Sequence, residues 1–418
     1  MSQHEPSRPI VLATVGTDGD IYPFLNLGRT LRARGHRVTL ASHEHFRGAA
    51  TESGLGFCAL VTSEETEALL TQEGMWHPLR GPLILGKWGA RLMHRQYCLL
   101  RELVEEPGTL LVASPGVVAA RVVQETSPVR LASLVLQPWL IPSTHAPAAI
   151  MGGLTLPRWA PHWAGRAYYR LFDGVGSILL GRELERLRAP LQLPPIRRVF
   201  RWWFSPALVI GLFPDWFGPP QPDWPPQMKL AGFPRLNGHA PGPLSQEVEA
   251  FFESGTPPVV FTFGTGMKHA ASLFSRCLEA CRRAGIRGIF VTRYQDQLPS
   301  PLPPFALPCA FAPFAGLFPR CAAVVHHGGV GTTAAALAAG RPQLILPFAF
   351  DQLDNAHRVH RLGMGTWLDR RRQSGEEIAK VLRWLTADFS PEPVRSVVER
   401  CRSVDGIERA AEILEDRW

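Results

Sequence analysis

Short apolar segments alternate with segments of helical periodicity along both halves of the chain. Ile10–Val15 is apolar, and in the next segment, Pro23–Arg34, the residues Phe24, Leu27 and Leu31 recur at helical spacing. Because buried strands that alternate with helices are typical of parallel sheets, this pattern predicts an α/β fold. By the same criterion we predict further strands at Val38–Ala41, Leu110–Ala113, Leu131–Leu136, Leu208–Leu212, Val259–Phe263, Gly288–Thr292, Ala306–Phe311, Ala323–His326 and Leu344–Leu346, and further helices at Leu273–Ala284 and Thr332–Ala339.

A proline-rich segment, Pro214–Pro243, interrupts this alternation. It has no helical period, and its prolines exclude a helix or a central strand. With 418 residues, the chain is also too long for one ordinary hydrophobic core. We therefore predict two doubly wound domains, residues 1–213 and 244–418, joined by a linker over residues 214–243.

The composition excludes several classes of protein. Lys and Arg number 44 against 36 Asp and Glu, but only four of the basic residues are lysines, so the excess reflects a bias toward arginine and we expect no nucleic-acid partner. The seven cysteines form no CxxC pair, which excludes a zinc ribbon. Residues 1–9 lack the apolar stretch of a signal peptide, and prolines interrupt the apolar stretch Leu131–Leu156. We expect a cytoplasmic protein that does not cross a membrane but is weakly attracted to anionic membrane surfaces.

The segment from His326 to Ala356, HHGGVGTTAAALAAGRPQLILPFAFDQLDNA, holds the most specific motif. A glycine-rich turn follows a predicted strand there and leads into a predicted helix. Glycines let the backbone approach a ligand, and the first N–H groups of a helix are unpaired, so this turn is a ready site for an anion such as a diphosphate without a metal ion. The residues that would form it are Gly328, Gly329, Gly331, Thr332 and Thr333.

Asp351 and Gln352 lie just past the next predicted strand, at the same carboxyl edge of the sheet. A carboxylate beside an amide suits the recognition of sugar hydroxyls, which need acceptors and donors in a fixed pair. Alone, the glycine turn is equally compatible with a tight connection between a strand and a helix. The DQLDN sequence downstream favours the binding interpretation.

These motifs and their spacing resemble glycosyltransferase family 1, which includes sterol glucosyltransferases and enzymes that glycosylate macrolides and glycopeptides. The resemblance covers nearly the whole chain and implies a GT-B fold, in which two Rossmann-like domains face a central cleft. The N-terminal domain would bind the acceptor and the C-terminal domain the nucleotide-sugar donor. A nucleotide sugar is a substrate, so we expect no cofactor and no metal.

The resemblance also implies roles for single residues. Phe311 would stack on the donor base, since the FAP at 311–313 matches a WxP in the family, and the Ala312 backbone would pair with that base. His327 would contact the diphosphate, as would Thr265 in the FGTG loop, and Asp351 and Gln352 would hold the sugar. Many relatives carry a glutamate for the ribose eight residues after the motif histidine, where this chain has Ala335. That departure leaves the choice between uridine and thymidine donors open.

The turn after the first strand, Val15–Phe24 with the sequence VGTDGDIYPF, resembles the G-x-x-GD-x-x-PF signature of the family, in which Asp20 would be the catalytic base. Two alternatives remain at this turn. Asp18 and Asp20 could form a DxD metal motif, or the aspartates and glycines could serve only the geometry of a solvated turn.

Two other segments have competing interpretations. His43 and His45 could be two metal ligands, but without a third ligand a solvated turn is favoured. Arg197–Phe204, RRVFRWWF, could touch a membrane, form a wall of the acceptor pocket, or pack as a helix under the following strand. We favour the packed helix because aromatic stripes are usually core.

A narrower resemblance is carried by Phe200–Pro234, Arg287–Thr292 and Ala312–Gly329, which look like the bacterial rhamnosyltransferases that make rhamnolipids. It implies an inverting, metal-independent transfer of L-rhamnose from dTDP-L-rhamnose to a hydroxyalkanoyl lipid, with peripheral contact at the inner membrane. The alternatives are a UDP-glucose-dependent enzyme acting on a sterol, polyketide or glycerolipid, a sugar-nucleotide epimerase, and a non-catalytic nucleotide-sugar-binding protein. The presence of Asp20 argues against the last.

Overall fold

The computed structural model describes residues 8–149, 156, 160–235, 242–390 and 392–417. The chain forms two compact units, Met1–Phe233 with Asp405–Trp418, and Pro234–Val404. Three predicted segments lie partly outside the described residues: the polar N-terminus at 1–7, the apolar stretch at 150–155 and the linker at 236–241. In the described part of the chain, no helix is long and apolar enough to span a membrane.

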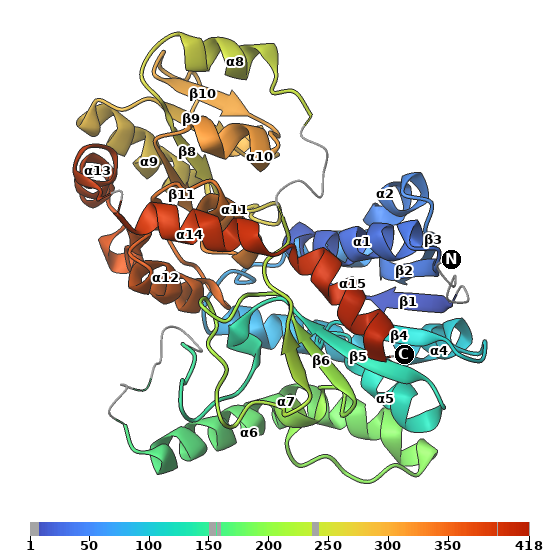
Figure 1. The fold of residues 1–418 in the computed structure, drawn as a ribbon. Coiled ribbons are helices and arrows are strands. Elements are labelled where there is room, and N and C mark those ends of the chain that lie inside the picture. Colours follow the sequence, from blue (N-terminus) through green and yellow to red (C-terminus); the bar gives the residue numbers. More distant parts are fainter. Residues whose placement is uncertain (1–7, 150–155, 157–159, 236–241, 391, 418) are drawn as a thin grey trace. The chain divides into compact units, whose positions relative to one another are not determined.

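The first unit is built on a seven-stranded sheet with the order β3-β2-β1-β4-β5-β6-β7, in which every neighbouring pair is parallel (Figure 1). The order reverses direction between β1 and β4, and open α/β sheets bind ligands at such a switch point, outside the carboxyl ends of the strands. The strands are β1 (Pro9–Ala13), β2 (Arg37–His43), β3 (Gly56–Val61), β4 (Leu110–Ala113), β5 (Arg130–Val135), β6 (Leu208–Gly211) and β7 (Met228–Leu230).

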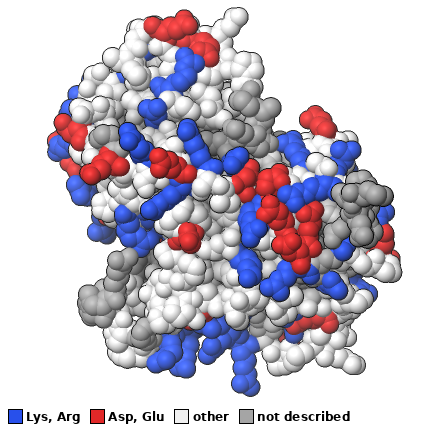
Figure 2. Space-filling view, in the orientation of Figure 1, with Lys and Arg blue, Asp and Glu red and all other residues white. Residues whose placement is uncertain are grey.

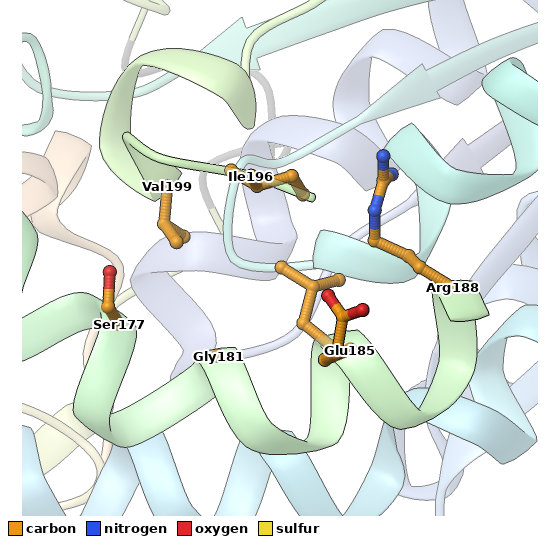
Figure 3. Close-up of a pocket in the computed structure, with 7 residues that line it drawn as sticks. Ser177, Gly181, Glu185, Arg188, Ile196 and Val199 are labelled. Atoms are coloured by element: carbon orange, nitrogen blue, oxygen red, sulfur yellow. The ribbon is translucent and has the colours of Figure 1, made fainter. Parts of the chain in front are cut away.

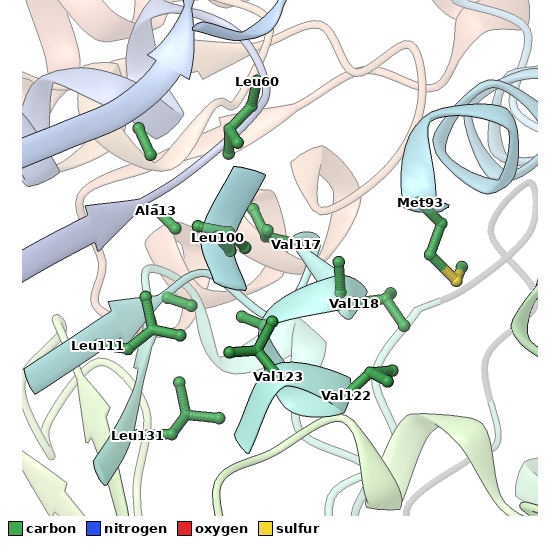
Figure 4. Packing of buried hydrophobic residues seen from close by; sticks show 14 of the residues in the cluster. Ala13, Leu60, Met93, Leu100, Leu111, Val117, Val118, Val122, Val123 and Leu131 are labelled. Atoms are coloured by element: carbon green, nitrogen blue, oxygen red, sulfur yellow. The ribbon is translucent and has the colours of Figure 1, made fainter. Parts of the chain in front are cut away.

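Helices of the first unit bury their apolar stripes against this sheet. In α1, the predicted stripe of Phe24, Leu27 and Leu31 is fully buried. Figure 4 shows the packing of a second cluster, in which Leu100 of α4 and Val122 of α5 are both fully buried. The helices are α1 (Asp18–Ala33), α2 (Arg47–Glu52), α3 (Ser63–Leu70), α4 (Arg80–Leu103), α5 (Val118–Thr126), α6 (His162–Arg188), α7 (Val199–Trp202) and α15 (Gly406–Arg417).

The second unit repeats the plan with a six-stranded parallel sheet of order β10-β9-β8-β11-β12-β13. Its switch point lies between β8 and β11. The strands are β8 (Val259–Thr262), β9 (Gly288–Val291), β10 (Ala306–Cys309), β11 (Ala323–His326), β12 (Gln343–Ile345) and β13 (Gly365–Trp367). The helices are α8 (Gln246–Glu253), α9 (Ala271–Ala284), α10 (Phe314–Leu317), α11 (Val330–Ala338), α12 (Gln352–Arg361), α13 (Gly375–Arg383) and α14 (Glu392–Ser403).

The predicted α/β class and all ten predicted strands are confirmed, but the chain divides differently from the prediction. Helix α15 lies in the first unit (Figure 1). There Arg34, which directly follows α1, forms ion pairs of 2.6 Å with both Glu408 and Glu415. Part of the predicted linker also belongs to the first unit, because residues 228–230 form the edge strand β7. An edge strand pairs on one side only, so the prolines around it do not exclude it.

Candidate active site

The turn after β1 holds Asp20 at the switch point of the first sheet. Helix α1 begins at Asp18, earlier than predicted, with Thr17 as its N-cap. The Oδ2 atom of Asp20 accepts hydrogen bonds from the Thr17 backbone N–H at 2.8 Å and from the Thr17 hydroxyl at 3.1 Å. Burial raises the pKa of Asp20 above its ordinary value, and the bonds from Thr17 only partly oppose this effect. A carboxylate with a raised pKa is a better proton acceptor, as a general base requires.

Gly16 makes room for this carboxylate. Its φ of +142° lies in a region that side chains rarely adopt, and a Cβ there would stand 2.3 Å from the Oδ2 of Asp20. The Gly16 N–H donates to the Nε2 of His43 at 3.0 Å. The backbone conformation at Gly16 therefore sets the position of Asp20, and the hydrogen bond to His43 stabilises that conformation.

His43 is a buried, neutral residue of the fold rather than a metal ligand. Burial lowers the pKa of His43 to about 4. Its Nδ1 lies 2.7 Å from the hydroxyl of Thr66, which itself donates to the Thr62 carbonyl at 3.0 Å. Since Nε2 accepts from Gly16, the proton resides on Nδ1 and points to Thr66. Among the described residues, no group of three or more His, Cys, Asp or Glu side chains is placed to hold a metal ion.

The glycine-rich turn of the second unit joins β11 to α11 at the switch point of its sheet. Helix α11 begins at Val330, and in the described structure no side chain caps its N-terminus. Its first N–H groups are thus open to an anion. Gly331 is exposed and Thr332 partly buried, whereas the Thr333 hydroxyl donates to the Gly329 carbonyl at 3.0 Å. Thr333 therefore serves the helix, contrary to the expectation that it offers a hydroxyl to the ligand.

His326 fixes this turn in the way that His43 fixes the turn of the first unit. Its Nδ1 accepts the Gly328 N–H at 3.1 Å, and its Nε2 lies 2.9 Å from the Oε1 of Gln343. Burial lowers the pKa of His326 to about 3, so its ring is neutral and donates to Gln343. Gly328 has a φ of +98°, and a Cβ on it would meet the Gln352 backbone at 2.8 Å.

His327 lies between the two glycine turns of the second unit. A Cβ on Gly264 would stand 3.0 Å from its ring, and one on Gly329 would stand 2.5 Å from its Nε2. Burial lowers the pKa of His327 to about 4. Its Nδ1 is buried and has no hydrogen-bond partner among the described residues. The FGTG loop, with the partly buried Thr265, is therefore adjacent to the glycine-rich turn after β11 at this histidine.

Asn355 of α12 connects the start of that helix to the glycine-rich turn after β11. The amide of this fully buried residue donates to the Gly328 carbonyl at 2.9 Å and to the Oδ2 of Asp351 at 2.7 Å. Gln352 also bonds its own loop, because its Oε1 accepts the backbone N–H groups of Phe348 and Ala349 at 2.7 and 3.1 Å. Within the described residues, only its Nε2 is left for a sugar hydroxyl.

The residues predicted to bind the nucleobase of the donor follow the end of β10. The Phe311 side chain is 69% exposed, which is unusual for a large apolar side chain and leaves its face available for stacking. Ala312 beside it is buried. Ala335 is buried in the same apolar cluster as Ala312, so the position at which many relatives carry a glutamate faces the core.

The aromatic residues of RRVFRWWF pack inside the first unit, in agreement with the packed-helix interpretation. Phe200 stacks on Phe172 of α6 with ring centroids 4.5 Å apart. The Trp202 indole donates to Glu125 at 2.8 Å and packs against Arg188. A cavity of only about 40 Å³, close to the volume of one water molecule, lies between this segment and α6 (Figure 3).

Sequence reasoning missed three residues that hold the two turns: His43, His326 and Asn355. The sequence favours a solvated turn at His43 over a metal ligand, and it places His326 only at the end of a strand. For the two histidines, the available signal was a polar side chain at the buried C-terminal end of a strand, in each of the two units. Such a residue must find a partner, and the nearest donor is a glycine N–H of a neighbouring turn.

Comparison with known proteins shows the family to which the chain belongs. The family described as glycosyltransferase family 28 N-terminal domain matches residues 10–95, and the erythromycin biosynthesis protein CIII-like C-terminal domain matches residues 289–402. An O-mycaminosyltylonolide 6-deoxyallosyltransferase of Streptomyces fradiae is 31% identical, with 97% of each chain covered. A sterol 3-beta-glucosyltransferase of Arabidopsis thaliana is 27% identical and matches 97% of this chain and 68% of its own length.

Solved structures show the same fold. The crystal structure of the glycosyltransferase of kitacinnamycin superposes with a TM-score of 0.71 at 20% identity, covering 99% of this chain and 100% of the other. The spinosyn rhamnosyltransferase complexed with thymidine diphosphate gives a TM-score of 0.64 at 17% identity, with 98% and 100% covered. The chain belongs to the nucleotide-sugar glycosyltransferases of the GT-B type. It is a glycosyltransferase of the group that contains the erythromycin CIII-like and family 28 domains.

Proposed function

We propose that this glycosyltransferase moves L-rhamnose from dTDP-L-rhamnose to a hydroxyl group of a lipid-like acceptor, a hydroxyalkanoyl fatty acid, with inversion at the anomeric carbon. The observation that carries the proposal is the partly buried Asp20 at the carboxyl end of β1, with its raised pKa. A hydroxyl group is a poor nucleophile at neutral pH and needs such a base.

In the proposed reaction, Asp20 takes the proton of the acceptor hydroxyl while the oxygen of that hydroxyl forms a bond to the anomeric carbon. The bond from that carbon to the diphosphate breaks, and its electron pair leaves with dTDP. The first N–H groups of α11 and the hydroxyl of Thr265 would hold the departing diphosphate without a metal ion. Phe311 would stack on the base, and Asp351 with Gln352 would bind the sugar.

The donor and acceptor are supported by resemblance and by relatives. The relative from Streptomyces fradiae is named for a 6-deoxyhexose, the class of sugar to which rhamnose belongs. The relative from Arabidopsis thaliana is named for the hydroxyl of a sterol, which is a lipid. The structural neighbour with thymidine diphosphate is named a rhamnosyltransferase. A lipid acceptor would bring the enzyme to the cytoplasmic face of the inner membrane as a peripheral protein.

The sterol relative favours one second candidate, a UDP-glucose-dependent enzyme acting on a sterol, polyketide or glycerolipid. A matrix of donors and acceptors, read by mass spectrometry, separates the two. We expect product from dTDP-L-rhamnose with a 3-hydroxyalkanoyl acceptor and little from UDP-glucose or UDP-glucuronate. Product only from UDP-glucose with a sterol would replace the first proposal with the second. The control is a reaction with donor but without acceptor, since an epimerase would change the sugar of the donor in this reaction and a transferase would not.

A further inference from the structure

A cavity of about 280 Å³ in the first unit is lined by more positive than negative charge. Four arginines and two aspartates reach it, which leaves a formal excess of two positive charges. The arginines are Arg166 and Arg170 of α6, and Arg198 and Arg201 beside and within α7. Figure 2 shows blue side chains gathered along the lower edge of the view, over α6 of Figure 1.

The four arginines are exposed, and Asp173 only partly balances the charges of Arg198 and Arg201. Among the described residues, none of their guanidinium groups donates a hydrogen bond or forms an ion pair. Elsewhere in the same unit exposed arginines are paired, as Arg95 is with Glu65 at 2.5 Å. Arginine is the side chain best suited to phosphate and carboxylate groups, because its planar donors match their oxygens.

Among the described residues, the two aspartates of the cavity form no hydrogen bond or ion pair with these arginines. Asp223 accepts from the Ser143 hydroxyl at 2.6 Å and from the Thr144 backbone and hydroxyl at 2.6 and 2.9 Å. Burial alone would raise the pKa of Asp223, but these bonds outweigh it and lower that pKa. Burial raises the pKa of Asp173, and the positive charges of Arg198 and Arg201 only partly oppose this effect.

The walls of the cavity are held in place. The Tyr168 hydroxyl donates to the Ala148 carbonyl at 2.9 Å, and the Tyr169 hydroxyl accepts the Ala148 N–H at 3.2 Å. These two buried bonds fix the segment before α6 to the helix itself. The arginines of α6 and the segment that carries Thr144 therefore form one structured site.

The same helix presents an apolar stripe to solvent. Trp163, Leu171 and Ile178 are 66%, 67% and 81% exposed, among the largest values for apolar side chains in the described chain. Their spacings of eight and seven residues are each close to two helical turns, so the three side chains lie on one side of α6. At about 100° per residue, Arg166 and Arg170 lie roughly 60° and 20° around the helix from Trp163, on the side away from Leu171 and Ile178, so the two arginines border the stripe.

We propose that this surface, the cavity arginines with the exposed stripe of α6, binds an anionic phospholipid membrane. The arginine cavity takes the phosphate of a lipid head group, and the indole of Trp163 with the side chains of Leu171 and Ile178 enters the boundary between head groups and acyl chains. Charge complementarity selects a lipid surface over another protein chain, because an apolar stripe bordered by unpaired arginines matches both parts of an anionic lipid. The surface does not depend on the transferase reaction or on the identity of its substrates.

Sedimentation of the full-length protein with vesicles tests this surface. We expect binding to vesicles of 70% phosphatidylcholine and 30% phosphatidylglycerol at 0.1 M salt, and no binding to phosphatidylcholine alone. The variant R170Q/R198Q should bind about 25-fold more weakly, from about fivefold for each arginine near an anionic surface. The matched control R282Q/R395Q removes the same charge from exposed positions of the second unit and should change binding less than threefold.

A third variant, L171S/I178S, should weaken vesicle binding while leaving the net charge unchanged. All substituted side chains are exposed, so the melting temperature should stay near that of the wild type in each variant. Equal losses in R170Q/R198Q and in the control would reduce the effect to net charge and overturn the proposal. Binding of inorganic phosphate or decanoate to the arginine cavity, with no binding of the protein to vesicles, would also overturn the proposal, because the site would then take a soluble anion.

Discussion

The Nε2 atom of His43, at the end of β2, accepts the backbone N–H of Gly16, just past β1, at 3.0 Å. The second unit contains the same relationship between His326 and Gly328 at 3.1 Å. In both units a buried neutral histidine holds a glycine of a turn at the switch point of the sheet. The two turns are those proposed for the catalytic base and for the donor diphosphate, so the same device positions both halves of the chemistry.

These histidines should make the stability of the protein fall in acid. The pKa of His43 is lowered by burial to about 4 and that of His326 to about 3, whereas a histidine in the unfolded chain titrates near 6.5. Between about pH 6.5 and pH 4 the unfolded state therefore binds protons that the native state does not, and stability is lost as the pH falls. At pH 5 each histidine should cost up to about 2 kcal/mol relative to pH 7.

Urea unfolding at pH 7 and pH 5 measures this loss in wild type and in His43→Gln, whose amide can still accept the Gly16 N–H. The variant should lose less stability between the two pH values than the wild type. An equal loss in both proteins would show that His43 is protonated alike in the folded and unfolded states.

Asp20→Asn should lower kcat by about 10² to 10⁴-fold, the usual contribution of a positioned proton acceptor. The amide oxygen can still accept the bonds from Thr17, so the turn should keep its shape. Because the raised pKa shows that the charged carboxylate is unfavourable where it is, removing the charge should not lower the melting temperature.

Calorimetric titration with dTDP provides the control for Asp20→Asn, because the proposed donor residues belong to the other unit and the Kd should be unchanged. In the wild type, kcat should fall as the pH falls through the raised pKa of Asp20. A variant that keeps more than about a tenth of wild-type kcat when chemistry is rate-limiting would exclude Asp20 as the base.

The sequence predicted what is local and missed what depends on neighbours in the sheet. Apolar runs and glycine turns are adjacent in sequence, so ten strands and both turns could be placed before the fold was known. The partner of His43 lies 27 residues away and meets it only because β2 pairs with β1. The segment that forms α15 was assigned to the second domain because it follows that domain in the sequence. Its charged residues nevertheless pair with Arg34, the residue that caps the C-terminus of α1.

The candidate site shows the same limit. The motif HHGGVGTT with DQLDN could be read directly, but the hydrogen bonds within it could not. Gln352 turned out to bind its own loop, and Asn355 to connect that loop to Gly328. Predicting such bonds requires the path of the backbone, because an amide side chain bonds to whichever backbone group or ligand lies within reach.

Phe311→Ala should weaken donor binding by about 1 to 3 kcal/mol, the range for stacking of a base on an aromatic ring. Since the side chain is 69% exposed, its removal should leave the melting temperature unchanged. Trp384→Ala offers a matched control, because Trp384 is a 40% exposed aromatic residue of the same unit outside the candidate site. If both variants bind dTDP as tightly as the wild type, Phe311 does not contact the base.

Transfer activity should survive EDTA. The open N-terminus of α11 and the Thr265 hydroxyl supply donors for the diphosphate, so a divalent cation is not required to neutralise it. The measurement is initial rate after chelation, with and without added Mg²⁺ or Mn²⁺. Activity that is lost on chelation and restored by either ion would instead favour the metal interpretation of Asp18 and Asp20.

Two glycines of the same turn allow a matched test of how Asp20 is positioned. A Cβ at Gly16 would stand 2.3 Å from the Oδ2 of Asp20, and its φ of +142° is unfavourable for alanine. At Gly19, in the first turn of α1, a Cβ would have only an ordinary contact of 3.8 Å with Thr17. Gly16→Ala must therefore displace the carboxylate, whereas Gly19→Ala leaves it in place and favours the helix by up to about 1 kcal/mol.

We expect kcat to fall at least tenfold in Gly16→Ala with an unchanged Kd for dTDP, and to stay near the wild-type value in Gly19→Ala. Equal activities in the two variants would mean that the position of Asp20 does not limit the reaction.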